Sequence, residues 1–261
     1  IFLYCVGACC LWCFMAHCIF IRLCTCLKRP HKIRKEAMRE VTSWPLLAAH
    51  RGGSIERAEN TIDAFKHAVE LGCNSMETDV HMTADGEVII FHDSDLERVC
   101  GPEFVDKKIS DFNFKDLPPL AKRFPMHFAD GDYEMKSHES GKICTLRELF
   151  EFCDGQANPI VVSIDLKGST PELCEKVNSL VKEFKREDLV LWGSMFKPQQ
   201  QMIARLNPNV TSFYSGTQAL CLYLWWLCGC LFCCPLGADA LQTTHLTTPA
   251  KARLKRMIQR R

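Results

Sequence analysis

Acidic side chains recur where short apolar segments of this sequence end. Glu77 and Asp79 lie two residues apart in the segment 75–80, and Asp165 lies in the apolar segment 160–166. Residues two apart on a β-strand share one face, so Glu77 and Asp79 would repel each other unless a cation lies between them. A surface position at a strand end explains any one carboxylate. The three together favour a site for a hard divalent cation with oxygen ligands.

Histidine and basic side chains accompany these carboxylates. His50 and His92 each follow a short apolar segment and could serve as general base and general acid, while His92 could alternatively bind the metal. Arg51 and Lys167 supply positive charge for a phosphate, and the glycines at 52–53 let the backbone approach an anion closely. This set of side chains predicts phosphate-ester chemistry.

The segments that must position these residues alternate between strand and helix patterns. Strands are expected at 46–50, 75–80, 87–92, 160–166, 189–192 and 210–214, and helices at 59–71, 145–153, 171–185 and 197–206. Asp85-Gly86 is typical of a turn between the second and third strands, and 93–144 is expected to be an insertion of low regularity. The alternation predicts an α/β fold with a parallel sheet, either doubly wound or closed as a (β/α)8 barrel, with the chemistry at the carboxyl ends of the strands.

Two apolar segments flank this region. Residues 1–21 carry no Lys, Arg, Asp or Glu and match the roughly 20 residues of a transmembrane helix. Because basic residues follow at 22–35, we favour an uncleaved anchor over a signal peptide, with the rest of the chain on the cytoplasmic side. The second segment, 219–236, is interrupted by Gly and Pro and contains Trp225-Trp226, so it could dip into one leaflet or cross the membrane a second time.

The amino-acid composition limits the kinds of protein that this chain could be. The chain has 261 residues, 47% of them hydrophobic, and a net charge of +1, which excludes a disordered chain and argues against a nucleic-acid partner. Most of its 17 cysteines lie in the two apolar segments, where they act as small hydrophobic residues rather than as zinc or redox motifs. Cys24 and Cys26 are candidates for palmitoylation, with unmodified thiols in a reducing compartment as the alternative.

Six short motifs, taken together, resemble those of the glycerophosphodiester phosphodiesterases. They are His50-Arg-Gly-Gly53, Glu59-Asn-Thr61, Glu77-Thr-Asp-Val80, Thr83-Ala-Asp-Gly86, Phe91-His-Asp93 and Ile164-Asp-Leu-Lys167. They follow the family's order over about residues 46–216. The similarity is greatest to a membrane-anchored branch that acts as lysophospholipase D, and Asp165 stands where many relatives have Glu.

The resemblance implies a TIM barrel and assigns roles to individual residues. It implies that Glu77, Asp79 and Asp165 bind Mg²⁺ or Ca²⁺. It also implies that His50 and His92 are the acid/base pair, with His92 sometimes in the metal shell. Arg51 and Lys167 would hold the phosphate, and Glu59 would lie near the site. The substrate would be a lysophospholipid or another glycerophosphodiester. Its glycerol hydroxyl could attack the phosphorus first, releasing the head-group alcohol and leaving lysophosphatidic acid or its cyclic form.

The resemblance and the apolar segments together divide the chain into five parts. These are a transmembrane anchor (1–27), a basic juxtamembrane linker (28–45), a partial phosphodiesterase barrel (46–216), a hydrophobic membrane-associated insertion (217–236) and a divergent basic tail (237–261). Relatives continue with two more strand–helix units, so we expect a truncated barrel with little activity alone, located in the endoplasmic reticulum or another endomembrane. The alternative is a catalytically inactive membrane protein that binds lipid or a full-length relative. The sequence leaves the oligomeric state open.

Overall fold

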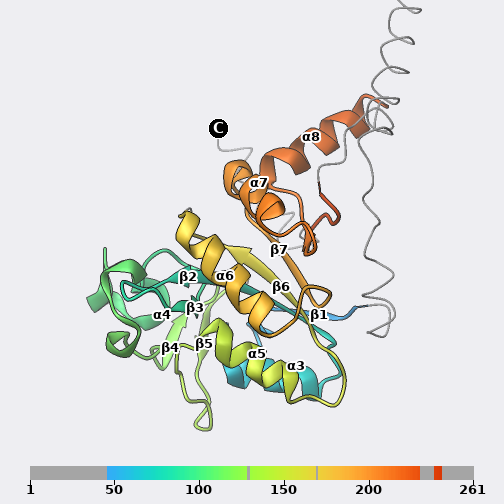
Figure 1. Cartoon of the computed structure of the whole chain (residues 1–261). Coiled ribbons are helices and arrows are strands. Elements are labelled where there is room, and N and C mark those ends of the chain that lie inside the picture. Colours follow the sequence, from blue (N-terminus) through green and yellow to red (C-terminus); the bar gives the residue numbers. More distant parts are fainter. Residues whose placement is uncertain (1–45, 128–129, 169, 230–237, 243–261) are drawn as a thin grey trace, which may run out of the picture.

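The computed structural model describes residues 46–127, 130–168, 170–229 and 238–242 (Figure 1). The expected anchor (1–27), the basic linker (28–45), Cys24, Cys26 and most of the tail lie outside these residues. In the part of the chain that is described, no helix combines the length and the hydropathy of a membrane span. The structure therefore bears on the barrel and on the start of the hydrophobic insertion.

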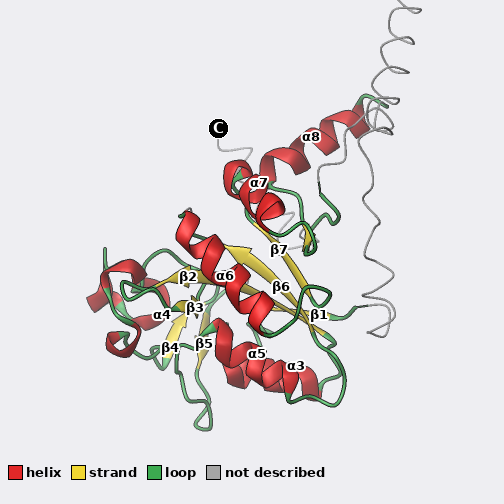
Figure 2. Cartoon of the chain, in the orientation of Figure 1, coloured by secondary structure: helices red, strands yellow, loops and turns green. Residues whose placement is uncertain are grey.

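A mostly parallel sheet forms the centre of the fold (Figure 2). Its parallel strands, in spatial order, are β1 (Ala48–His50), β2 (Ser75–Met82), β6 (Val161–Leu166), β7 (Val190–Gly193) and β8 (Thr211–Ser212). Apolar and β-branched residues dominate β6, which is buried at nearly every position, as expected for a strand covered on both faces. The expected α/β class and these five strands are confirmed. Among the described residues the sheet runs from β1 to β8 without closing.

The third strand corrects one expectation. β3 (Val88–Ile90) pairs antiparallel with the end of β2, with Ile90 opposite Val80 and Val88 opposite Met82. We expected all the strands to end at one edge of a parallel sheet, and that is wrong for β3. A parallel connection needs a crossover of a dozen or more residues, whereas the turn between β2 and β3 is too short for one. The chain therefore folds back, and the segment after β3 returns along the carboxyl half of β2.

Four expected helices are present and pack in sequence order beside the sheet (Figure 1). They are α3 (Ile62–Glu70), α5 (Leu146–Asp154), α6 (Pro171–Glu183) and α7 (Lys197–Leu206). The hydroxyls of Thr61, Thr145 and Thr170 cap the first three by accepting backbone N–H bonds. Their apolar faces, including Phe65 and Phe150, join Met76, Val162 and Trp192 of the strands in one buried cluster.

The insertion between β3 and α5 is more ordered than its sequence suggests. It contains α4 (Glu97–Cys100), three 3-10 turns (Pro102–Phe104, Ile109–Asp111 and Phe114–Asp116) and a hairpin of β4 (Arg123–Pro125) and β5 (Asp132–Glu134). A second apolar cluster, which includes Phe91, Leu96, Phe124 and Tyr133, holds these pieces together. Glu139 accepts hydrogen bonds from Tyr133 Oη at 2.7 Å and from the Ala58 backbone N–H at 2.8 Å. The insertion is thus fixed against the loop that precedes α3.

The start of the hydrophobic insertion forms a helix with no buried residue. This helix, α8 (Gly216–Leu227), leaves Leu220, Tyr223, Leu224, Trp226 and Leu227 at least half exposed. Beyond it, Ala240 lies in a parallel bridge with Phe213, and the Tyr214 N–H donates to the Ala240 carbonyl at 2.9 Å. Residues 238–242 therefore extend the sheet beyond β8, a contact that the sequence did not predict.

Candidate active site

The candidate site is built by the register of three neighbouring parallel strands. His50 at the end of β1 is paired with Glu77 of β2, and Asp79 of β2 is paired with Asp165 of β6. Glu77 and Asp79 share a face of β2 because side chains alternate along a strand. Four of the residues predicted from the sequence are therefore brought to one edge of the sheet by backbone pairing alone.

His50 and Glu77 lie close enough to influence each other. The distance from His50 Nε2 to Glu77 Oε2 is 3.8 Å, and the imidazole is half-exposed. Burial and the nearby Arg51 cation lower the pKa of His50 to about 4, so its ring is neutral at neutral pH and can accept a proton. Burial and the neighbouring Asp79 raise the pKa of Glu77 to about 8, although Glu77 Oε2 accepts the Arg51 backbone N–H at 3.1 Å.

Lys167 lies between the two paired aspartates. Its Nζ is 3.0 Å from Asp79 Oδ1 and 2.6 Å from Asp165 Oδ2. The second oxygen, Asp165 Oδ1, is buried and has no hydrogen-bond partner among the described residues, and burial raises the pKa of this carboxyl. A buried carboxylate oxygen without a partner, beside two further carboxylates, is a donor set that fits Mg²⁺ or Ca²⁺. The predicted metal ligands are thus chemically suited to that role.

Arg51 is turned toward carboxylates rather than toward solvent. It is 1% exposed, its Nη1 is 2.9 Å from Glu59 Oε1, and its Nε is 3.4 Å from Asp79 Oδ2. Asn60 Nδ2 donates to the same Asp79 oxygen at 3.2 Å. The backbone of Arg51 has a φ of 51°, in the left-handed region that L-residues rarely adopt. In this structure Arg51 and Asn60 hold Asp79 in place and Glu59 anchors Arg51, so a phosphate contact by Arg51 would be additional to this role.

A chain of charged side chains supports His92. His92 Nδ1 and Asp93 Oδ1 are 2.5 Å apart, Arg98 Nε donates to Asp93 Oδ2 at 2.5 Å, and Arg98 Nη2 donates to Glu59 Oε1 at 2.6 Å. Burial alone would raise the pKa of Asp93, but its hydrogen bonds with His92 and Arg98 hold that pKa well below its usual range. Asp93 therefore remains a carboxylate that orients the His92 ring, as in carboxylate–histidine pairs of hydrolases.

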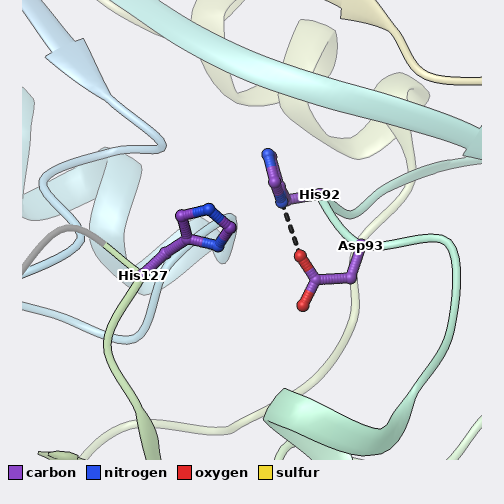
Figure 3. A group of neighbouring side chains, drawn as sticks. All are labelled: His92, Asp93 and His127. Carbon is purple, nitrogen blue, oxygen red and sulfur yellow. Dashed lines mark hydrogen bonds and ion pairs between the residues drawn. The ribbon is translucent and has the colours of Figure 1, made fainter. Parts of the chain in front are cut away.

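Sequence reasoning missed several members of this site. Asp93 was part of a motif but was given no role, and Arg98 stands in no motif. His127, beyond β4, faces His92 with ring centroids 4.9 Å apart in a T-shaped arrangement (Figure 3). His81, two residues after Asp79, places its Nε2 3.3 Å from the His92 carbonyl oxygen. Position on the face shared by Glu77 and Asp79 could have identified His81, whereas no sequence pattern marks Arg98 or His127.

The chain is similar in sequence to known proteins. The sequence model of the glycerophosphoryl diester phosphodiesterase family matches residues 50–225. The chain is 33% identical over 173 residues to lysophospholipase D GDPD1 from Homo sapiens, covering 66% of this chain and 52% of that protein. It is 30% identical over 169 residues to a glycerophosphodiester phosphodiesterase from Caldanaerobacter subterraneus, covering 63% of this chain and 64% of that one. The chain thus spans about half the length of the lysophospholipase D relatives that it matches.

Solved structures share the fold at lower identity. A glycerophosphodiester phosphodiesterase from Parabacteroides distasonis is 22% identical with a TM-score of 0.54, covering 81% of this chain and 87% of that chain. A glycerophosphoryl diester phosphodiesterase domain from Mycobacterium tuberculosis is 16% identical with a TM-score of 0.55, covering 71% of this chain and 65% of that chain. These similarities support the barrel-like α/β fold expected from the sequence.

Proposed function

Because the chain belongs to the glycerophosphoryl diester phosphodiesterase family, we propose that the edge formed by β1, β2 and β6 hydrolyses phosphodiesters of lysophospholipids or related glycerophosphodiesters. The observation that carries this proposal is the pairing of Asp79 with Asp165 beside the neutral His50 and the carboxylate-bound His92. Two histidines in different environments suit the two opposite proton transfers that phosphodiester cleavage requires.

Glu77, Asp79 and Asp165 are the side chains that would hold a divalent cation. When bound, Mg²⁺ or Ca²⁺ would supply positive charge to the phosphoryl oxygens. Lys167, which is already 2.6 Å from Asp165, would add a second positive charge to the same oxygens. Arg51 and Asn60 would keep Asp79 fixed, since a carboxylate with several partners keeps one orientation, and Glu59 would hold Arg51.

The two histidines would move protons during the reaction. Neutral His50 would take the proton from the attacking hydroxyl, which is the neighbouring glycerol hydroxyl of the substrate or water. His92, oriented by Asp93, would give a proton to the head-group oxygen as its bond to phosphorus breaks. The products would be the free head-group alcohol and either lysophosphatidic acid or a cyclic phosphate that water then opens.

A lipid substrate is supported by the exposed apolar face of α8. Leu220, Leu224 and Leu227 together with Tyr223 and Trp226 remain half or more exposed, and Tyr and Trp favour the interface between membrane and water. Relatives named lysophospholipase D also match the chain. Membrane attachment through 1–27, an endomembrane location and a cytoplasmic catalytic side are parts of the same proposal.

A second candidate is a catalytically inactive protein that binds lipid or a full-length relative. The open order of the described sheet, from β1 to β8, favours this alternative because barrel closure normally buries both edges. The two candidates share the fold and differ only in turnover. Activity measured on the intact chain therefore separates them.

The test is choline release from lysophosphatidylcholine by membranes that contain this chain. We expect release that stops when EDTA removes divalent cations and when Glu77 is changed to Ala, with Glu175→Ala on the exposed side of α6 as the matched control. Immunoblotting checks that each variant is present in the membrane in equal amount, so that differences in expression do not affect the comparison. Absence of release from the parent chain would favour the inactive lipid-binding protein.

A further inference from the structure

A second cluster of potential metal ligands lies beside the proposed cation site. Among the described residues, His92, Asp93 and His127 form a group in which one ligand atom from each lies within 4.8 Å of the other two (Figure 3). Glu77, Asp79 and Asp165 offer only carboxylate oxygens, whereas this cluster offers two imidazole nitrogens and one carboxylate. The two groups therefore differ in the kind of ion that they prefer.

We propose that His92, Asp93 and His127 bind a transition-metal ion of the Zn²⁺ class, at a site separate from the Glu77, Asp79 and Asp165 carboxylates. Imidazole nitrogen suits Zn²⁺, Co²⁺ and Ni²⁺, whereas oxygen-only sites suit Mg²⁺ and Ca²⁺. Three protein ligands with water in a further position is a common arrangement for zinc. The ligand chemistry thus assigns different ions to the two sites.

The surroundings hold the three side chains near one another. Asp93 is fixed by Arg98 Nε at 2.5 Å, and the Arg98 charge is balanced by Glu59 as well as by Asp93. His127 comes from the β4–β5 hairpin, whose base is buried through Phe124 and Tyr133 with ring centroids 5.5 Å apart. The hairpin therefore brings a side chain from far along the sequence to the end of β3.

An open depression gives ions access to the cluster. It has a volume of about 600 Å³, and Asp93, Arg98 and His127 are among the residues that line it. Arg123 also lines it, but its Nε is paired with Asp132 Oδ2 at 2.8 Å, which offsets its charge. Two nearby carboxyl side chains, Asp95 and Glu97, add negative charge to the same depression. An entry path and a favourable local field are two of the features that a metal site needs.

Occupation of this site has a consequence that rests on the proposed function. A metal ion on either ring nitrogen of His92 would interfere with proton transfer, because Asp93 orients the ring through Nδ1 and the other nitrogen would carry the proton. Zn²⁺ would therefore inhibit the hydrolysis that Mg²⁺ or Ca²⁺ supports. The binding itself requires no turnover, so it can be tested whether or not the chain is an active enzyme.

The experiment uses Co²⁺ as a spectroscopic probe for Zn²⁺ on the purified 261-residue chain in detergent. Saturating Mg²⁺ occupies the carboxylate site, and N-ethylmaleimide first alkylates accessible thiols such as Cys221 and Cys228, because thiolates also bind these ions. Visible d–d absorption then reports Co²⁺ binding, and a near-ultraviolet thiolate band reveals any remaining cysteine ligand. His127→Ala tests the site, and His138→Ala, an exposed histidine of the same insertion, is the matched control.

We expect His127→Ala to weaken Co²⁺ binding about tenfold or more, as loss of a ligand does, and His138→Ala to leave it unchanged. Zn²⁺ should displace the Co²⁺ signal in the parent chain. Equal affinity in the parent and in His127→Ala, or absence of a d–d band in the parent, would overturn the proposal. If the parent chain binds Co²⁺ but releases no choline, the proposed function is contradicted and the proposal of a metal site is retained.

Discussion

Asp79 and Asp165 are directly paired across β2 and β6, and the Lys167 ammonium joins them at 3.0 and 2.6 Å. The Arg51 guanidinium also lies close to Asp79, with its Nε 3.4 Å from Asp79 Oδ2, and Glu77 lies on the same face of β2 as Asp79. Asp165 Oδ1 remains buried without a hydrogen-bond partner in the described part of the chain. This buried carboxylate oxygen without a partner, beside the carboxyl groups of Glu77 and Asp79, is the physical basis for expecting a divalent cation at the sheet edge.

Changing Asp165 to Asn should remove turnover while leaving the fold intact. The change deletes one oxygen donor of the proposed cation site, so we expect kcat to fall by about a hundredfold or more. The thermal midpoint should stay near that of the parent because Lys167 keeps Asp79 as its partner. Steady-state kinetics and a thermal melt measure the two effects, with Asp116→Asn in the insertion as the control. Full activity in Asp165→Asn would show that this carboxylate is not a ligand.

The cation-free protein should lose stability as the pH rises. The pKa of Glu77 is raised in the folded state from 4.5 to about 8, so folding favours its protonated form. The contribution of this protonated carboxyl to the free energy of unfolding is complete below about pH 4.5 and disappears as the pH rises through about 8. Thermal melts in EDTA should show this decline between these values, and Glu77→Gln should flatten it. Added Mg²⁺ should also flatten it, since a bound cation stabilises the carboxylate. If the thermal midpoint of the parent chain depends on pH in the same way as that of Glu77→Gln, the raised pKa of Glu77 is refuted.

Changing Asp93 to Asn should impair the reaction through His92. An amide at this position no longer accepts the His92 Nδ1–H as a carboxylate does, so the ring loses its preferred orientation and tautomer. We expect kcat to fall by about 10²- to 10⁴-fold with a small effect on KM. Asp95→Asn, two residues further on, serves as the control. An unchanged kcat in Asp93→Asn would remove the orienting role.

Gly52 and Gly53 offer a matched pair for the loop that carries Arg51. Both have positive φ, of 77° and 94°, but a Cβ on Gly52 would lie 2.8 Å from Ala64 Cβ, whereas a Cβ on Gly53 would meet nothing within 4 Å. Gly53→Ala should therefore destabilise the chain through backbone strain alone, by about 1–2 kcal/mol. Gly52→Ala should add about 1–3 kcal/mol from overpacking against α3. Chemical denaturation measures both, and equal losses would contradict the close approach of the loop to α3.

The central carboxylates could be predicted from the sequence because they depend on local pattern. The period-two spacing of Glu77 and Asp79 and the apolar run around Asp165 specify strands, and parallel pairing then brings the carboxylates together. The antiparallel direction of β3 could also have been predicted, since the short turn at Asp85-Gly86 permits a hairpin and not a crossover. The strands and the turn therefore require only short-range information, and the alternation of strands and helices then predicts the parallel pairing.

The residues that surround His92 could not be predicted in the same way. Glu59 and Arg98 are 39 residues apart in sequence, and they meet only because the insertion folds onto the loop before α3. His127 reaches His92 through the packing of a hairpin that shows no periodic pattern. The burial of Arg51 likewise depends on Glu59 and Asp79 arriving from two different segments. Contacts of this kind follow from tertiary packing rather than from local sequence.

Phosphodiester hydrolysis at the β1–β2–β6 edge can be followed by ³¹P NMR of lysophosphatidylcholine incubated with membranes that contain this chain. We expect the phosphodiester signal to convert to a phosphomonoester, directly or through a cyclic phosphate, in step with choline release. The conversion should be absent with EDTA or in Glu77→Ala. No conversion by folded, membrane-bound parent chain, or equal conversion by Glu77→Ala, would contradict a phosphodiesterase centre at the β1–β2–β6 edge.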